Sequence, residues 1–533
     1  KKLYEIESVP SVPVESYEVS QDDLKFLEVM NSDVEKIDGH YVIPLPFREK
    51  NPSIVNNIKT AGRRLISLKR KFEKDEKFKN DYISSVSILL EKGYARKVSS
   101  VYPEGKNWYI PHHGVYHPRK KKLRVVWDCS SVTNGVSLND LLLQGPDLTN
   151  DLLGVLMRFR EEKVAFMADI EAMFYQVKVP ENQRGFFQFL WWEDGDTSRP
   201  YEHYEMCVHV FGATSSPSCS NFALKASALE GKSKHGEKAF DALNRSFYVD
   251  DYLKSTSFVC EASSLIKGVI LMCREGGGFR LTKFVSNVPE VLKDLPNEDR
   301  KVIGELETLS LCQSETFLGL PWNIRNDTLN LCNMSAKDSK LTRRGILSTV
   351  SSIYDPLGIA SPFVLEGKLI LQRLCQLNLG WDESLPDRFQ KDFIHWKSNL
   401  PCLKEIVVSR CYKPAFFSDI VEDVSLHHFS DASDFAYGCC SYLRLVDSNE
   451  NVHCSLVVGK SRVAPIKQIS TPRLELTAAG LNVKVAKVVR RELDYKIKRE
   501  FFYTDSTIVL GYIKNESKRF KRIVANRVRA ITI

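Results

Sequence analysis

The stretch RSFYVDDYLKS, Arg245 to Ser255, places two adjacent carboxylates inside an apolar and aromatic run. Successive side chains of a regular strand point to opposite faces, so Asp250 and Asp251 can converge on one site only where the chain turns. The residues on either side are β-formers, and Asp tolerates turn conformations. The stretch therefore predicts a β-hairpin with both acids at its tip. Taken alone, it also fits an ordinary surface turn, and further acids must decide between the two.

Another acid closes an apolar strand in VAFMADIEAMFYQVKV, where the first apolar run reaches Asp169. Together with Asp250 and Asp251, it gives three carboxylates at a strand end and a hairpin tip. A two-metal phosphoryl-transfer site needs such a set, because two divalent cations roughly 3.5–4 Å apart must be bridged and neutralised. Hard oxygen ligands suit Mg²⁺ or Mn²⁺, so we expect two such ions per active site.

Length and composition indicate a multidomain protein of ordinary globular type. The 533 residues, 43% hydrophobic and 27% charged, contain no apolar run as long as the roughly 18 residues of a membrane helix, so we expect no membrane partner. The beginning of the sequence has no secretory core and no initiating Met, which favours an intracellular fragment or processed product. Thirteen cysteines without a CxxC pair indicate reduced thiols rather than a zinc site or a disulfide framework.

The net charge of +8 is concentrated in three basic patches, Lys69 to Lys79, His117 to Arg124 and Lys518 to Arg529. The first mixes both signs at helical spacing, which is typical of a solvated helix face. The second opens the β-patterned run LRVVWDCSS, where contact with a polyanion and a plain surface role both remain open.

The order of patterns along the chain indicates several folded units. Residues 1–60 are rich in Pro, Val and acids, and we expect an extension there. Apolar positions at helical intervals between residues 55 and 95 predict two amphipathic helices. A later helix over 262–273 ends at the glycines of EGGGFRLTKF, and residues 300–410 predict a short hairpin, ETFLGLPWN, followed by a helix bundle. Strands are expected near 123–128, 164–170, 185–192, 201–208 and 246–255.

The last part of the chain carries three more acids at the ends of expected elements. LHHFSDASDFAYGCCSYLRL ends an apolar strand at Asp431, and two further strands turn at DSNEN. A helix then begins with Thr471 as its cap, Pro472 at its first position and Glu475 in its first turn. EFFYTDSTIVLGYI places Asp505 at the end of an aromatic strand. Glu475 alone also fits a helix-dipole partner, whereas the three acids together fit a second metal site.

Several motifs resemble the polymerase segment of Pao/BEL-type LTR retrotransposon polyproteins. YVDD, with the aspartate-plus-aromatic motif upstream, is similar to a reverse transcriptase palm. The wider likeness spans nearly the whole chain and rests on KLRVVWDCSS…GVSLNDLLLQGPDL, FMADIEAMFYQV, VFGATSSPSCSNFAL, YVDDYLKS and SIYDPLGIASPF, flanked by YVIPLPF and WDESLP. The resemblance implies an α+β multidomain protein, a right-hand polymerase followed by a ribonuclease H-like domain, which synthesises DNA on RNA and DNA templates.

The resemblance also implies domain boundaries and partners. It places fingers and palm over 61–300, thumb and connection over 301–412, and the ribonuclease H-like domain over 413–533. The expected partners are an RNA template, a DNA primer, an RNA–DNA hybrid and dNTPs. The expected location is the cytoplasm, in a virus-like particle, or the nucleus, and the oligomeric state stays open, with a dimer as one arrangement. No protease or integrase signature is visible, so we expect a piece of a longer polyprotein.

Carried over position by position, the resemblance assigns the polymerase metals to Asp169 and Asp250, with the Ile170 carbonyl completing the coordination and Asp251 supporting it. In the ribonuclease H-like domain it assigns them to three further acids, Asp431, Glu475 and Asp505. The family pattern has a fourth aspartate there, on a last helix after a fifth strand. The sequence stops before either, so we expect an incomplete domain with slow or absent hydrolysis.

The resemblance also assigns residues to nucleotide binding, and each of them has an alternative interpretation. Arg124 matches a fingers arginine that grips triphosphate oxygens, and one of Lys120 to Lys122 shares this role. Phe174 matches the residue that blocks a ribose 2′-hydroxyl, and Lys283 in RLTKF matches a lysine near the triphosphate. For these residues, a surface charge or a core aromatic is the alternative interpretation.

One position departs from the retroviral pattern. Phe211 stands where many retroviral enzymes have a glutamine that contacts the nucleotide. Gly212, Ser216 and Pro217 still match, which implies that backbone and template contacts persist there. FLGLPWN resembles the primer grip, with an apolar hairpin formed by Phe317, Leu318 and Gly319.

Two other functions compete with a polymerase. The chain fits a non-catalytic nucleic-acid-binding protein derived from a retroelement, because basic patches suit both. Binding alone requires none of Asp169, Asp250 and Asp251, whose charges oppose phosphate, and this favours the enzyme. A nucleotide cyclase sharing the palm topology is disfavoured by the basic segments typical of a template channel.

Overall fold

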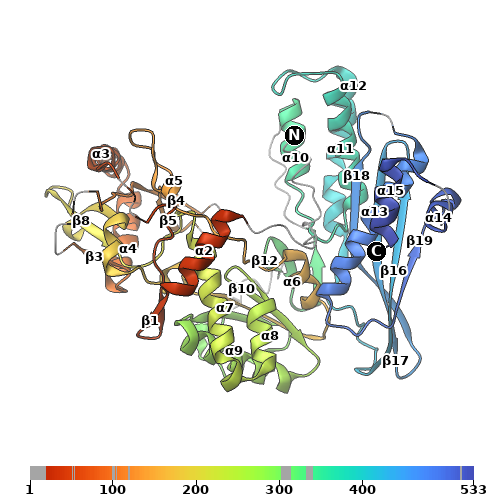
Figure 1. The fold of residues 1–533 in the computed structure, drawn as a ribbon, viewed down its shortest axis with the longest axis horizontal. Coiled ribbons are helices and arrows are strands. Elements are labelled where there is room, and N and C mark those ends of the chain that lie inside the picture. Colours follow the sequence, from red (N-terminus) through yellow and green to blue (C-terminus); the bar gives the residue numbers. More distant parts are fainter. Residues whose placement is uncertain are drawn as a thin grey trace.

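A computed structural model describes residues 20–50, 52, 54–98, 102–103, 105–117, 121–301, 314–331, 340–467, 469–515 and 519–532, with residues 314–317 and 523 described in their backbone only. The chain mixes helices with mainly antiparallel sheets, the mixed α and β content expected (Figure 1). None of the described helices is long and apolar enough to cross a membrane.

The helices are α2 (Gln21–Ser32), α3 (Ile58–Lys74), α4 (Glu76–Glu91), α5 (Leu138–Leu141), α6 (Leu152–Phe159), α7 (Ser216–His235), α8 (Glu237–Arg245), α9 (Val259–Gly277), α10 (Arg343–Ser351), α11 (Ser361–Gln376), α12 (Asp387–Ser398), α13 (Thr471–Glu492), α14 (Thr507–Ile513) and α15 (Arg522–Thr532). The strands are β1 (Glu35–Ile37), β2 (His40–Val42), β3 (Ala95–Lys97), β4 (His112–Tyr116), β5 (Leu123–Trp127), β6 (Val164–Ile170), β7 (Gln188–Trp192), β8 (Tyr201–Met206), β9 (Phe247–Tyr248), β10 (Asp251–Thr256), β11 (Leu281–Ser286), β12 (Ser314–Phe317), β13 (Leu320–Asn323), β14 (Thr328–Asn330), β15 (Val407–Ser409), β16 (Val421–Ala432), β17 (Ala436–Asp447), β18 (Val452–Val463) and β19 (Arg499–Tyr503).

The N-terminal lobe consists of α3, α4, the sheet β3-β8-β7 and the hairpin β4-β5, at the left of Figure 1. Both predicted amphipathic helices are present, and Asp75 caps α4 by accepting the Phe78 N–H at 2.9 Å. Their buried faces meet an aromatic core, in which Tyr82 stacks on Trp191 with ring centroids 5.5 Å apart. The expected strand over 185–192 begins only at Gln188, because residues 181–187 form a 3₁₀ turn.

Residues 20–50 fold onto the rest of the chain, where an extension was expected. Ser20 caps α2 by accepting the Asp23 N–H at 3.1 Å. Phe26 and Met30 of α2 are buried in the same core as the sheet that contains β6 and β10. Because only these two positions of the helix are fully buried, its apolar periodicity is weak in the sequence.

The central sheet has the antiparallel order β11-β6-β10-β9. α9 packs on β6 and β10, and α7 and α8 pack on α9 (Figure 1). The predicted hairpin over 246–255 is β9 and β10, in which Phe247 pairs with Tyr252 and their rings stack at 4.6 Å. Tyr252 is fully buried, so the base of the hairpin is fixed in the core.

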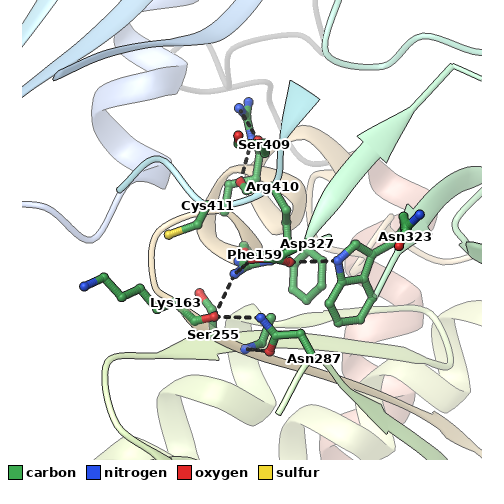
Figure 2. A network of polar contacts seen from close by, with 12 residues as sticks. Phe159, Lys163, Ser255, Asn287, Asn323, Asp327, Ser409, Arg410 and Cys411 are labelled. Atoms are coloured by element: carbon green, nitrogen blue, oxygen red, sulfur yellow. Dashed lines mark hydrogen bonds and ion pairs between the residues drawn. The ribbon is translucent and has the colours of Figure 1, made fainter. Parts of the chain in front are cut away.

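The hairpin sheet, β12-β13-β14-β15, is fixed to the central sheet through a buried arginine (Figure 2). Arg410 is 0% exposed and donates from Nε and Nη2 to the two carboxylate oxygens of Asp327, at 2.6 and 2.7 Å. It also donates to the Phe159 carbonyl at the end of α6, and Trp322 donates to Asp327 at 2.9 Å. Such a bidentate, charge-assisted pair adds geometric specificity as well as energy. The hairpin sheet is therefore held at a set position beside the start of β6.

The C-terminal sheet has the order β18-β17-β16-β19, with β19 parallel to β16. α13 packs on β16 and β17, which confirms the predicted succession of three strands, a helix and a strand. The predicted helix cap is corrected by one residue: Ser470 is the cap, and Thr471 begins the helix with its hydroxyl bonded to Asp434 at 2.8 Å. Glu475 consequently lies beyond the first turn.

The helical layer, α10 to α12, stands beside the C-terminal sheet, with α11 packed along β18 (Figure 1). Its core contains Leu374, Phe393 and Trp396, as expected for a helix bundle. The turn between α10 and α11 carries the motif SIYDPLGIASPF. This turn lies between the hairpin sheet and the C-terminal sheet, since Leu357 is buried in a core that both sheets share.

Candidate active sites

The central site lies at the tip of the β9–β10 hairpin. Asp251 is paired with Asp169 of β6, and Asp250 stands in the turn beside them. The Ile170 N–H donates to the Asp250 carbonyl at 2.8 Å, which ties the turn to the end of β6. Val249 has a φ of +57°, a conformation that β-branched residues rarely adopt. The structure thus brings the three acids together beside a strained backbone position, a feature that clusters at functional sites.

Like charges meet at this tip. Burial, and then the negative charge of Asp169, raise the pKa of Asp250 above its ordinary value. The positive charges of Lys283 and Arg124 act in the opposite direction. Lys283 Nζ lies 2.7 Å from Asp169 Oδ2 and forms an ion pair with it. The site therefore concentrates negative charge that nearby cations compensate in part.

The donor chemistry of this tip fits hard divalent cations, because carboxylate oxygens are their preferred ligands. Burial, and then the charge of Asp169, raise the pKa of Asp250, and a bound cation would favour its ionised form. Within the described ranges, no group of three or more His, Cys, Asp and Glu side chains is already placed around a metal position. The carboxylates of Asp169 and Asp250 would therefore have to turn toward the ions, with Lys283 released from Asp169.

One basic residue of the β4–β5 hairpin acts electrostatically on the same acids. Arg124 is exposed on β5, and its charge reaches Asp250. Lys121 and Lys122 are exposed just before β5, whereas Lys120 lies outside the described residues. The structure thus places Arg124, from one unit, and Lys283, from another, around one carboxylate cluster.

Phe174 lies in a 3₁₀ turn shortly after β6, and its ring stacks on Phe211. The ring centroids are 5.8 Å apart and the planes are inclined by 28°. Phe211 is 65% exposed, and neither ring belongs to a hydrophobic core of the described residues. The pair therefore lies at the surface, where its rings are able to meet a ligand.

The loop after Phe211 needs a glycine. Gly212 has a φ of +140°, and a Cβ there would lie 2.1 Å from the Trp127 carbonyl oxygen of β5. Asn139 holds the loop from both sides, because its Nδ2 donates to the Gly212 carbonyl at 3.0 Å and its Oδ1 accepts the Thr214 N–H at 2.9 Å. The loop is thereby closed against the strand that carries Arg124.

The residues expected to contact the template and the primer differ in how exposed their side chains are. Ser216, at the start of α7, is fully buried, so only the exposed Pro217 and the backbone remain for a template contact. The predicted hairpin of FLGLPWN is present, and it turns at Leu318 and Gly319 with φ of +46° and +85°. The side chain of Phe317 lies outside the described residues.

The second site lies at one end of the C-terminal sheet. The parallel register of β16 and β19 pairs residue 429 with residue 503, and the same offset puts Asp431 opposite Asp505. Glu475 of α13 accepts a hydrogen bond from the Ser506 hydroxyl, next to Asp505. The structure thus gathers the three predicted acids at one edge, although it does not close them into a metal cluster among the described residues.

A cavity of about 770 Å³ opens beside these acids. Its lining includes Asp431, Asp505 and Lys460 of β18 on the sheet side, and Gly358 and Pro362 from the turn before and the start of α11. Burial lowers the pKa of Lys460. The cavity therefore presents two carboxylates and one amine to any molecule that enters it.

Residues 342–506 match the family described as Pao retrotransposon-like RNaseH-like domain. Over these residues the chain is similar to that family. They comprise the helical layer and the C-terminal sheet as far as Ser506, so the boundary expected at residue 413 falls inside the matched region. The resemblance to a Pao/BEL-type segment drawn from the motifs is thereby confirmed.

Comparison with curated proteins gave no match. A solved structure of the foamy viral protease-reverse transcriptase dRH with dsDNA is 16% identical and covers 83% of this chain and 65% of that chain, with a TM-score of 0.52. Two solved complexes of the foamy viral protease-reverse transcriptase are also 16% identical, each with a TM-score of 0.49. The complex with an RNA/DNA hybrid covers 84% of this chain and 52% of that chain. The complex with dsDNA covers 84% of this chain and 78% of that chain. The first match shows a shared reverse transcriptase fold, and this chain spans about two thirds of that chain's length.

Sequence patterns did not single out several residues that lie in or near the two candidate sites. Asn139 was visible only as part of a quoted motif, and Lys460 sits in a strand without a distinctive pattern. Tyr354 and Arg410 gain their surroundings from partners far away in the sequence.

Proposed function

We propose that this chain is an RNA- and DNA-templated DNA polymerase that uses two-metal phosphoryl transfer. The N-terminal lobe would serve as fingers, the central sheet as palm, and the hairpin sheet with the helical layer as thumb and connection. The observation that carries the proposal is the pairing of Asp251 with Asp169 beside Asp250, which gathers three acids from distant segments. A binding protein gains nothing from such a cluster, because it repels phosphate.

The residues around the central site divide the work. Asp169 and Asp250 would hold two Mg²⁺ or Mn²⁺ ions, with the Ile170 carbonyl and Asp251 in support. When bound, such ions activate the attacking 3′-hydroxyl and neutralise charge on the leaving oxygen.

The incoming dNTP needs cations and a sugar contact. Arg124 and Lys283 would bind its triphosphate oxygens, a role supported by the effect of their charges on Asp250. Lys283 would exchange its ion pair with Asp169 for the triphosphate as the site fills. Phe174, stacked on Phe211, would exclude a 2′-hydroxyl beside the sugar.

The Pao-type domain would act on the RNA strand of an RNA–DNA hybrid. Asp431, Glu475 and Asp505 would hold divalent ions at the edge of the C-terminal sheet. Lys460, in the same cavity, would bind a backbone phosphate of the hybrid.

One observation favours a second candidate, a nucleic-acid-binding protein without catalysis. The ion pair between Lys283 and Asp169 neutralises an acid that a metal ion would otherwise use. In such a protein this pair would be permanent, and the basic residues would serve template binding alone.

Primer extension on RNA and DNA templates tests the proposal. Wild type should extend both with Mg²⁺ or Mn²⁺, and Asp250→Asn should bind the primed template yet leave it unextended. Asp241→Asn, which changes an exposed aspartate of α8, provides a matched control that should extend like wild type. Equal extension by Asp250→Asn would refute the assignment of the metal site.

A further inference from the structure

The turn in the motif SIYDPLGIASPF is closed by its own aspartate. The Asp355 carboxylate accepts the N–H groups of Ile359 and Ala360 at 2.9 and 2.7 Å. Leu357 is 1% exposed in the core that the hairpin sheet and the C-terminal sheet share. The turn is therefore a fixed element and not a loose connection between α10 and α11.

Two glycines fasten this turn to β18. The Gly459 N–H donates to the Leu357 carbonyl at 2.9 Å. Gly358 has a φ of +70°, and a Cβ on it would lie 1.8 Å from the Gly459 carbonyl oxygen. No larger residue fits at Gly358 without displacing β18. Because Gly358 also lines the cavity with Asp431 and Asp505, one end of the turn belongs to the wall of the second site.

The other end of the turn carries Tyr354, which lies against the β12–β13 hairpin and near Tyr248 of β9. A Cβ on Gly319 would lie 2.9 Å from the Tyr354 ring, so the tip of the β12–β13 hairpin rests on that ring. Burial, and then the neighbouring Tyr248, raise the pKa of Tyr354 to about 12. Tyr248 stands two residues before Asp250 in the sequence.

Tyr354 combines this position with exposure. Its side chain is 41% exposed, and its hydroxyl makes no hydrogen bond to another residue within the described part of the chain. A tyrosine is a hydrogen-bond donor on a rigid, amphipathic ring, and such rings suit contacts with nucleic-acid backbones.

We propose that Tyr354 binds the 3′ end of the primer strand, with its hydroxyl donating to a backbone oxygen of the terminal nucleotides. This rests on the polymerase function proposed above. The hairpin that carries Asp250 and Asp251 and the hairpin that turns at Gly319 both adjoin Tyr354, so a primer end delivered to the acids passes this side chain.

Primer binding and crosslinking test the proposal directly. Tyr354→Phe keeps the ring on Gly319 and removes only the hydroxyl, so it should weaken primer-template binding by roughly 3- to 10-fold, the effect of one neutral hydrogen bond. The KM for dNTP should not change. A primer with 4-thiothymidine at its 3′ end should crosslink to the peptide that contains Tyr354, and the yield should drop when the probe is moved several nucleotides upstream.

The control is Tyr201→Ala, which removes a tyrosine of the same 41% exposure on β8. It should bind and extend primers like wild type. If Tyr354→Phe and Tyr354→Ala bind and extend primers as this control does, the inference about Tyr354 fails while the polymerase proposal stands. If wild type extends no primer at all, the polymerase proposal itself fails. Should Tyr354→Ala prove unfolded by circular dichroism, Tyr354→Phe decides alone.

Discussion

The stacked rings of Phe174 and Phe211 should act together in discriminating deoxyribonucleotides from ribonucleotides. Phe211 supports the Phe174 ring from one side, with centroids 5.8 Å apart and planes inclined by 28°. An aromatic pair of this kind contributes about 0.5–1.5 kcal/mol beyond its buried area. Removing the support in Phe211→Ala should therefore let the Phe174 ring move and lower discrimination against ribonucleotides by roughly 2- to 12-fold.

Phe174→Val removes the ring itself and should have the larger effect. Its expected loss of discrimination is roughly 10- to 200-fold, the range for a change of steric fit in an apolar pocket. The double variant should lose no more than Phe174→Val alone, because Phe211 then has no ring to support.

The assay is single-nucleotide incorporation, read as the ratio of kcat/KM for a dNTP to that for the matching rNTP. Phe416→Ala, at an aromatic residue that is 69% exposed and distant in sequence from either ring, is the control and should leave the ratio unchanged. An unchanged ratio in a folded Phe211→Ala protein would refute the reasoning. Fully additive effects in the double variant would refute it as well.

The remaining predictions concern charge and stability. The pKa of Asp250 is raised in the folded state, so ionisation of this carboxyl group destabilises the fold. Asp250→Asn should therefore unfold at a higher temperature than wild type at neutral pH. The difference should vanish as the pH falls below the pKa of the aspartate in the unfolded chain. Arg410→Met should lower the free energy of unfolding in urea by about 3–5 kcal/mol, because it leaves the Asp327 carboxylate without its buried partner. A loss below about 1 kcal/mol would mean that water replaces the guanidinium group. Template affinity should fall with salt at a log–log slope near −0.9 per duplex phosphate contact, and a flat response would exclude phosphate binding by the basic residues. Asp505→Asn should stop any cutting of hybrid RNA without slowing primer extension, and unchanged cutting would remove Asp505 from the second site.

The positions of the aspartates could be predicted from the sequence because each interrupts or ends an apolar strand pattern, whereas Glu475 lies in the helix α13. Asp169, Asp431 and Asp505 all stand at or just beyond strand ends, as their flanking patterns indicated. The register that pairs Asp251 with Asp169 could not be predicted, because it joins strands that no local pattern connects. The cap of α13 was misplaced by one residue for a local reason, since Ser470 and Thr471 are both good caps.

Features that depend on distant partners were invisible in the sequence. The Arg410–Asp327 pair spans 83 residues, and Gly358 and Gly459 lie still further apart in the sequence. The helix over residues 21–32 was missed because only two of its positions are fully buried, which leaves too weak a period to recognise. Residues 1–19 lie outside the described part of the chain.

Addition of a single nucleotide to a primed RNA template, titrated with Mn²⁺, tests the central claim most directly. The account predicts that wild type adds only the deoxynucleotide complementary to the template, that addition requires the ion, and that Asp250→Asn adds none while still binding the template. A wild-type protein that binds the primed template but leaves the primer unextended at every Mn²⁺ concentration would contradict the account and favour a protein that binds nucleic acid without catalysis.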